Sequence, residues 1–334
     1  MIKKVLIVCS EYWIKQIYLD CIIKNKLRNI ILISNKKNEF IKKSIANDKL
    51  NTDFKVTKNL SFMWLKNQIN LSNSIIISFG SPWIISNDII KRYKNKIFNI
   101  HQSALPQMRG AVNSYIALYN IRAIQSNIHM ITNKIDEGDV VYKRDIYIDR
   151  KLKLPEEINN YIQQENRLML SDFIKDHVFK KKKIKIYKQN EFFSTYNPRL
   201  KAEINGWINW NNDVYELERF LNAFDEPYPG AHTMLHGKKV VLKDADYSCS
   251  DASKHNFENG MVLRKFMNKI VISANKGSIY VGKILIGKKN IINKIKPGDI
   301  FYTPDKKLEF SKRKNIFIHK KRIYTKKRKI KKNL

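Results

Sequence analysis

The chain has 334 residues, of which 43% are hydrophobic, so it can build more than one domain and is not a disordered protein. Its apolar runs are far too short to span a bilayer, and its three cysteines (Cys9, Cys21 and Cys249) lack metal or redox spacing, so we expect a cytoplasmic protein with no membrane span. The net charge of +34 favours polyanionic partners, although the recurrence of Lys, Asn and Ile along the chain is more typical of an AT-rich genome.

The first hundred residues alternate short aliphatic runs, which predict buried strands, with amphipathic stretches, which predict helices. The predicted strands are residues 5–8, 30–33, 51–56, 75–77 and 97–100. The predicted helical segments are residues 13–23, 64–69 and 89–93. This alternation predicts an α/β fold with a Rossmann-like, doubly wound parallel sheet, in which ligands bind beyond the carboxyl ends of the strands. Neither GxGxxG nor GxxxxGK[ST] occurs, so no nucleotide-phosphate loop is predicted.

The pattern changes after about residue 183, where Pro198 and Gly206 mark a linker-like region. Residues 212–224 place apolar side chains at helical spacing, which predicts an amphipathic helix with Asn212 as its cap. Short β-like segments separated by Gly, Asn and Asp follow at residues 239–242, 261–264, 269–273, 278–281 and 301. We therefore expect a small, β-barrel-like C-terminal domain, of the kind that includes oligonucleotide-binding barrels.

Two polar residues, Asn99 and His101, stand at the end of the strand predicted at 97–100. Because strand side chains alternate, residues two apart face the same space. An amide N–H can stabilise a developing oxyanion, and an imidazole can accept or relay a proton near neutral pH. Leu105-Pro106 and Arg109-Gly110 follow as a stiff and then a flexible part of a loop bordering that space.

A carboxylate and a glycine, Asp136-x-Gly138, occupy a predicted turn between two β-like segments. A carboxylate at such a turn can orient the ring of His101 and stabilise its protonated form. His129, on an apolar segment, is interpreted as a core histidine. The other histidines have no metal-ligand spacing, so we expect no metal.

Taken together, Asn99-x-His101, Leu105-Pro106-x-x-Arg109-Gly110 and Asp136-x-Gly138 resemble the folate-dependent formyltransferase family over roughly residues 1–190. The resemblance implies a catalytic domain that uses 10-formyltetrahydrofolate as co-substrate, with Asn99, His101 and Asp136 as catalytic residues. It implies acceptor-binding roles for the loop residues Leu105, Pro106, Arg109 and Gly110. It assigns to the folate pocket the residues Phe79, Gly80, Ser81, Pro82, Trp83, Ile84, Asn133, Lys134, Ile135 and Glu137.

On this resemblance we divide the chain into a catalytic domain (residues 1–190), a linker and helix (191–230), a barrel-like domain (231–318) and a basic tail (319–334). The expected reaction moves a formyl group from the folate to an amine, and two classes of acceptor fit. The favoured acceptor is a nucleotide-linked amino sugar of surface-glycan biosynthesis, and the alternative is initiator tRNA, as in methionyl-tRNA formyltransferase. A homodimer is compatible with the sequence.

Three features favour the sugar. The loop at residues 103–110 departs from the Ser-Leu-Leu-Pro form that is usual in the tRNA enzyme. The segment 34–52 lacks the long basic insertion of the tRNA enzyme, and the stretches 196–200, 205–210 and 223–231 resemble bacterial sugar N-formyltransferases. Less favoured hypotheses are a 10-formyltetrahydrofolate hydrolase, in which water replaces the amine, and a non-catalytic nucleic-acid-binding protein.

Overall fold

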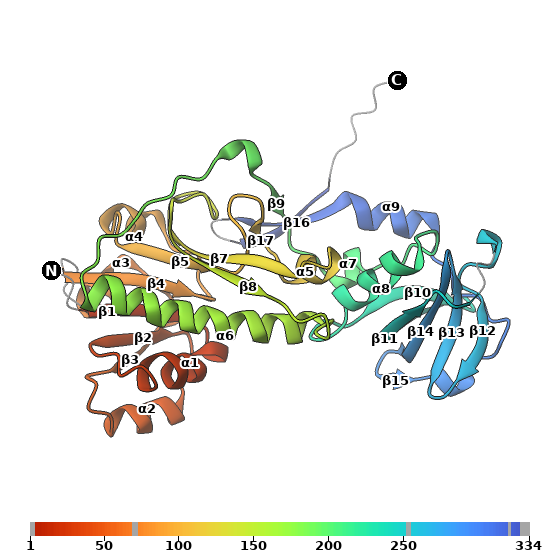
Figure 1. The fold of residues 1–334 in the computed structure, drawn as a ribbon, viewed down its shortest axis with the longest axis horizontal. Coiled ribbons are helices and arrows are strands. Elements are labelled where there is room, and N and C mark those ends of the chain that lie inside the picture. Colours follow the sequence, from red (N-terminus) through yellow and green to blue (C-terminus); the bar gives the residue numbers. More distant parts are fainter. Residues whose placement is uncertain (1–3, 69–72, 252–254, 320–321, 328–334) are drawn as a thin grey trace. The chain divides into compact units, whose positions relative to one another are not determined.

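The computed structural model describes residues 4–68, 73–251, 255–319 and 322–327, with the backbone alone for the last strands from residue 314 (Figure 1). Ile69 of a predicted helix, and residues 320–321 and 328–334 of the predicted basic tail, lie outside the described residues. The chain forms two compact units: the first contains residues 1–110, 123–147 and 161–196, and the second contains the remainder. Within the described residues, no helix is both long and apolar enough to cross a membrane.

The first unit is built on a seven-stranded sheet with the strand order β3-β2-β1-β4-β5-β7-β8 (Figure 1). Its strands are β1 (Lys4–Cys9), β2 (Ile30–Ser34), β3 (Asp53–Val56), β4 (Ser74–Phe79), β5 (Ile97–His101), β7 (Ala123–Met130) and β8 (Val140–Tyr147). Strands β1 to β5 are parallel, which confirms the predicted Rossmann-like fold. Strands β7 and β8 depart from the all-parallel expectation, since β7 is antiparallel to both of its neighbours. A short turn joins β7 to β8, and such a turn can connect only antiparallel strands.

Helices cover both faces of this sheet, because neighbouring residues of the buried strands point to opposite sides. Val5 and Ile7 of β1 pack in one apolar cluster, with side chains from α1 (Glu11–Gln16), the π-helix that continues it (Ile17–Ile23), α2 (Glu39–Ala46) and α6 (Pro155–Ile174). Leu6 and Val8 pack in a second cluster on the other face, with side chains from α3 (Phe62–Gln68) and α4 (Asn87–Arg92). The sheet is therefore held between two apolar layers.

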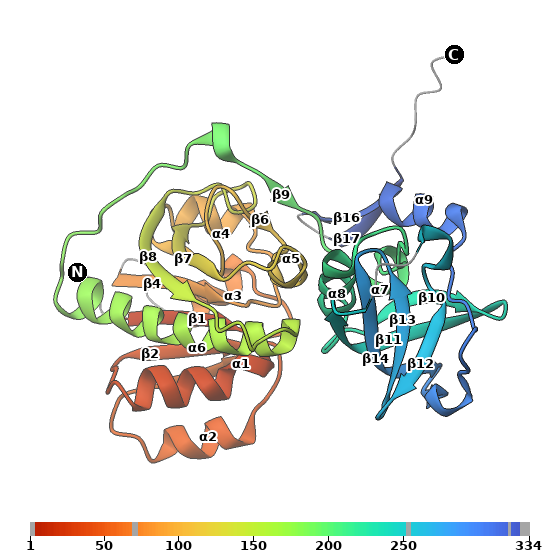
Figure 2. The same cartoon turned by 45° about the vertical axis from the view of Figure 1, so that its right-hand side comes forward.

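The second unit contains an antiparallel sheet with the strand order β10-β11-β14-β13-β12 (Figure 2). Its strands are β10 (Ala231–Leu235), β11 (Lys238–Ser248), β12 (Val262–Phe266), β13 (Lys269–Ala274), β14 (Gly277–Ile286) and β15 (Lys289–Asn290), which pairs with β14. Ile300 forms a bridge with Met261 beside β12, and Tyr302 forms one with Met234 in β10. The segment around residue 301 thus links both edges of the sheet, which confirms the barrel-like prediction.

Helix α8 (Val214–Ala223) packs its apolar side chains into the core of this barrel. Its N-cap is Asp213, whose side chain accepts a hydrogen bond from Glu216 N at 3.0 Å. The prediction of Asn212 as the cap is wrong because Asp213 immediately precedes the first helical residue, while the Asn212 side chain accepts from Asn209. The remaining elements are β6 (Arg109–Gly110), α5 (Asn113–Leu118), β9 (Tyr196–Asn197), α7 (Ala202–Asn205), α9 (Asp305–Arg313) and the hairpin of β16 (Lys314–His319) with β17 (Arg322–Lys327).

Candidate active site

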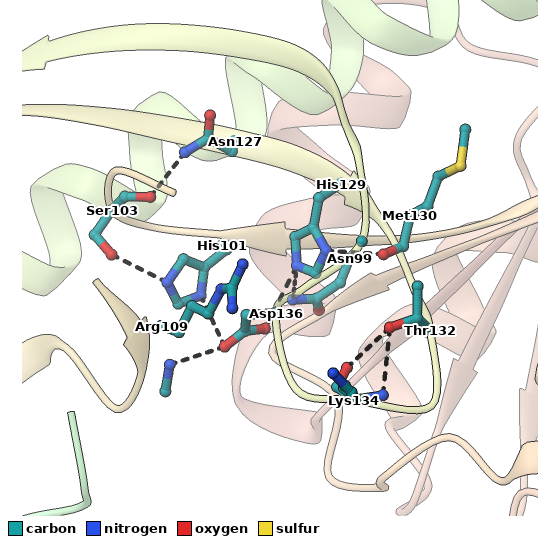
Figure 3. A network of polar contacts seen from close by, with 12 residues as sticks. Asn99, His101, Ser103, Arg109, Asn127, His129, Met130, Thr132, Lys134 and Asp136 are labelled. Carbon is teal, nitrogen blue, oxygen red and sulfur yellow. Dashed lines mark hydrogen bonds and ion pairs between the residues drawn. The ribbon is translucent and has the colours of Figure 1, made fainter. Parts of the chain in front are cut away.

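The carboxyl end of β5 carries Asn99 and His101, as the alternation of strand side chains predicts. Asn99 lies opposite Ser78 of β4 on one side and opposite His129 of β7 on the other. Its amide nitrogen Nδ2 is 3.1 Å from His129 Nε2 (Figure 3). The segment that follows β4, beginning at Gly80, therefore leaves the sheet beside the candidate catalytic residues.

The imidazole of His101 is buried and is contacted at both nitrogens. Nε2 lies 2.6 Å from the Met108 carbonyl oxygen and 3.0 Å from Ser103 Oγ. Because a carbonyl oxygen only accepts hydrogen bonds, Nε2 carries a proton and donates it. Nδ1 lies 3.6 Å from Asp136 Oδ2, so the other edge of the ring faces a carboxylate (Figure 3).

Asp136 stands on the β7–β8 turn between two histidines. Its Oδ1 is 3.4 Å from His129 Nε2, and its Oδ2 accepts a hydrogen bond from Gly110 N at 2.9 Å. Burial alone raises the pKa of the Asp136 carboxyl, but the charge of His101, the contacts with His129 and the Gly110 N–H together hold that pKa well below its usual range. Asp136 is therefore a carboxylate at neutral pH.

The glycine of the Asp136-x-Gly138 motif has a steric role. A Cβ at Gly138 would overlap the backbone carbonyl of Met130 at the end of β7. The turn can bring Asp136 back to the two histidines only because this close approach of two backbones is open to glycine.

His129 was not among the residues that the sequence predicts to be functional. It is buried, as expected for a core histidine, yet its Nε2 faces both Asn99 and Asp136, and its Nδ1 lies 2.9 Å from the Met130 carbonyl oxygen. The signal that could have identified it is the pairing of β5 with β7, which sets His129 directly opposite Asn99.

Arg109 is 5% exposed, and its guanidinium contacts three residues from farther along the chain, of which Glu137 forms an ion pair at 3.8 Å. It donates to Gln189 Oε1 at 2.8 and 3.2 Å, and to the Glu191 carboxylate at 2.6 and 2.9 Å. Gln189 Nε2 in turn donates to the carbonyl oxygens of Asp136 (2.8 Å) and Gly138 (2.7 Å). Arg109 thus supports the turn that carries Asp136. Nothing in the local sequence around Gln189 and Glu191 indicates this contact.

The other loop residues predicted to bind the acceptor surround the same network. Leu105 and Pro106 are buried, and the Pro106 carbonyl accepts a hydrogen bond from Thr195 N at 3.1 Å. Gly110 supplies its backbone N–H to Asp136. The loop therefore packs around His101 and Asp136 instead of extending into solvent.

The segment predicted to line a folate pocket is partly core and partly surface. Phe79 is buried against Trp13, and Gly80, at φ +55°, leaves room for the Trp13 ring. Ser81 and Trp83 close a short turn, while Pro82 and Ile84 are exposed. In the second predicted segment, Lys134 forms an ion pair with Glu137 at 2.9 Å, and Asn133 and Lys134 are exposed. Within the described residues, no group of three or more acidic, His or Cys side chains has the arrangement of a metal site.

Comparison with protein families matches residues 3–174 to "Formyl transferase" and residues 201–296 to "Formyl transferase, C-terminal domain". A methionyl-tRNA formyltransferase from Clostridium acetobutylicum is 29% identical over 241 residues, covering 68% of this chain and 74% of that protein. The bifunctional polymyxin resistance protein ArnA from Wigglesworthia glossinidia brevipalpis is 27% identical over 250 residues, covering 73% of this chain and 36% of that protein. The chain thus matches only about a third of the length of ArnA.

Two solved structures have a similar fold. An N-formyltransferase from Helicobacter canadensis, solved with folinic acid and dTDP-3-aminofucose, has a TM-score of 0.62 at 19% identity, over 84% of this chain and 99% of that one. A methionyl-tRNA formyltransferase from Clostridium thermocellum has a TM-score of 0.52 at 20% identity, over 75% of this chain and 96% of that one. At these identities the likeness is one of fold.

Proposed function

The chain belongs to the formyl transferase family, and on that premise we propose that it transfers a formyl group from 10-formyltetrahydrofolate to the amino group of a nucleotide-linked amino sugar. The observation that carries formyl transfer is the network at one sheet edge, in which Asp136 contacts His101 and His129, and His129 contacts Asn99. An amide donor, an imidazole and a buried carboxylate are the groups that acyl transfer to an amine requires.

Asn99, His101 and Asp136 have different roles in the proposed reaction. Bound 10-formyltetrahydrofolate supplies the activated formyl group; a C–N bond to the acceptor forms, the C–N bond to the folate breaks, and the amine proton passes to the folate nitrogen. The Asn99 amide has two N–H groups, of which one contacts His129. The second is available to stabilise negative charge on the formyl oxygen. His101 acts as the proton carrier, and Asp136 stabilises its protonated form.

The residues assigned to folate include apolar side chains that can cover the flat faces of its rings. The segment 79–84 starts where β4 ends, and β4 pairs with β5 at Ser78 and Asn99. Ile84 is exposed and Trp83 is partly exposed, which gives this segment apolar surface near the catalytic edge. The faces of the folate rings would bury this surface from water.

Two observations support a sugar acceptor. The N-formyltransferase from Helicobacter canadensis, which was solved in complex with an aminosugar nucleotide, aligns over 99% of its own length. Residues 35–52, which connect β2 to β3, contain the helix α2 and no long basic insertion. The second candidate, initiator tRNA, is favoured by the relatives named methionyl-tRNA formyltransferase and by the net charge of +34.

The test is formyl transfer from 10-formyltetrahydrofolate, followed by folate absorbance, for the wild type and His101→Ala. The acceptors are a panel of nucleotide-linked amino sugars and charged initiator tRNA. We expect turnover with a sugar nucleotide that is lost in the variant. Turnover with tRNA alone would show that the acceptor is tRNA and not a sugar nucleotide. Formate release without an acceptor would indicate a hydrolase. A wild type that binds no folate would overturn the proposal.

A further inference from the structure

A short segment beside the candidate active site exposes two phenylalanines. Residues 187–193, called the strap below, begin at Tyr187, whose backbone pairs with Val140 at 2.8 and 2.9 Å. Gln189 then donates to the carbonyl oxygen of Asp136, and Glu191 binds Arg109. The strap is thus fixed at three points to the β7–β8 hairpin and the Arg109 loop, which are the elements that hold Asp136.

Directly after Glu191 the strap makes one ordered turn. The Asn190 side chain accepts a hydrogen bond from Phe192 N at 3.1 Å, and the turn Glu191–Phe193 follows. Phe192 is 87% exposed and Phe193 is 52% exposed, and their rings meet edge to face with centroids 5.1 Å apart. Leaving two aromatic rings in water forgoes the free energy of burying them. An ordered turn that presents such a pair next to catalytic residues is typical of a ligand-binding surface.

Lysines lie within the strap and beside its first residue, Tyr187. Lys143 and Lys185 place their ammonium groups 4.7 and 5.0 Å from the centre of the Tyr187 ring. Lys188, within the strap, is exposed, and Lys134 of the catalytic turn is near enough to Glu191 to contribute to lowering its pKa, after the stronger effect of the Arg109 hydrogen bond. A segment that combines two exposed rings with lysines offers a stacking surface for a nucleobase and cations for its phosphates.

Three aromatic residues of the segment that follows the strap are not available for stacking. Trp207, Trp210 and Phe224 are buried, and the last two pack in the core of the barrel. The exposed pair on the strap is therefore the better platform for a flat ring.

We propose that Phe192 and Phe193 form a stacking platform for the nucleobase of the formyl acceptor. The proposal rests on the proposed function for the acceptor being nucleotide-linked, and it names the surface that recognises its base. The same chemistry suits the base of a nucleotide-linked sugar and an unpaired base of tRNA.

The direct test is calorimetric binding of UDP, dTDP and GDP, without any sugar, to the wild type and to the double variant Phe192→Ala/Phe193→Ala. The matched control is Phe257→Ala, because Phe257 is 90% exposed and lies in the second unit. We expect the double variant to bind the preferred nucleotide at least about tenfold more weakly, from the loss of base stacking, and the control to bind as the wild type does. Phe192→Tyr should retain binding, since its ring still stacks.

Equal affinity of wild type and double variant, at equal melting temperatures, would overturn the platform and leave formyl transfer intact. If the wild type binds no nucleoside diphosphate but formylates tRNA, the KM for tRNA decides: a rise in the double variant supports stacking on a tRNA base, and an unchanged KM overturns it. If nucleotide affinity falls in the double variant while the wild type formylates no sugar nucleotide, the platform stands and the proposed acceptor fails.

Discussion

Asp136 Oδ2 lies 3.6 Å from His101 Nδ1. It is on the opposite side of the ring from the Met108 carbonyl oxygen, which accepts the hydrogen bond from Nε2. A neutral His101 with its proton on Nε2 would turn a lone pair toward the carboxylate, whereas the imidazolium turns an N–H toward it. Asp136 therefore faces the ring nitrogen that gains a proton when His101 acts as the proton carrier.

Replacing Asp136 by asparagine keeps its shape and removes its charge. We expect the kcat for formyl transfer to fall by about 10²- to 10⁴-fold, the range that a positioned acid–base group contributes, while folate affinity changes little. Steady-state kinetics with folate titration checks this. The control is Asp88→Asn, because Asp88 is an exposed residue of α4. Full activity in Asp136→Asn would remove Asp136 from the mechanism.

Asp136 also links stability to pH. Its pKa in the folded state is below the unfolded value of about 3.9, so its charge stabilises the fold fully above that value and progressively less as pH falls toward the folded-state pKa. We expect the stability difference between the wild type and Asp136→Asn to narrow between about pH 5 and pH 2. Thermal melts across that range measure it, and a constant difference would contradict the lowered pKa.

His129 is expected to position Asn99. Its Nε2 lies 3.1 Å from the Asn99 amide nitrogen and 3.4 Å from Asp136 Oδ1, and its Nδ1 lies 2.9 Å from the Met130 carbonyl oxygen, so the ring is held in place beside the Asn99 amide. We expect His129→Phe to lower kcat by about tenfold or more with little change in the KM for the acceptor, and His129→Gln to recover part of the loss.

A double-mutant cycle with Asn99→Ala separates this role from a purely structural one. If His129 acts through Asn99, the two losses in kcat are far from additive. Additive losses, together with a lower melting temperature for every His129 variant, would show that His129 only supports the core.

Gly138 provides a test of the turn geometry. A Cβ at this position overlaps the Met130 carbonyl, so we expect Gly138→Ala to lower the free energy of unfolding by about 1–3 kcal/mol and to reduce activity by displacing Asp136. The control is Gly287→Ala, where the φ of +58° adds strain but the Cβ meets no atom within 4 Å. Chemical denaturation of both variants measures the difference, and equal losses would mean that the turn accommodates a side chain.

Much of this site follows from local sequence patterns, and the rest depends on pairings that such patterns do not show. The alternation of strand residues predicts that Asn99 and His101 face one space, and the motif resemblance adds Asp136. The contact of His129 with Asn99 and Asp136 depends on the register between two antiparallel strands, β5 and β7. An apolar segment by itself does not reveal that register. The support from Gln189 arises more than fifty residues downstream, in a segment without periodicity.

Arg109 supports the turn that carries Asp136 through its contact with Gln189. A guanidinium donates to Gln189 and Glu191 at the same time, and Gln189 holds the backbone of the Asp136 turn. Lysine keeps the charge but lacks the planar fork, so we expect Arg109→Lys to lower kcat about tenfold by loosening the turn. Glu191→Gln keeps a hydrogen-bond acceptor for Arg109 and should reduce kcat less. If Arg109 instead contacts the acceptor directly, Arg109→Lys will raise the KM for the acceptor and leave kcat unchanged, an outcome that steady-state kinetics distinguishes from a loosened turn.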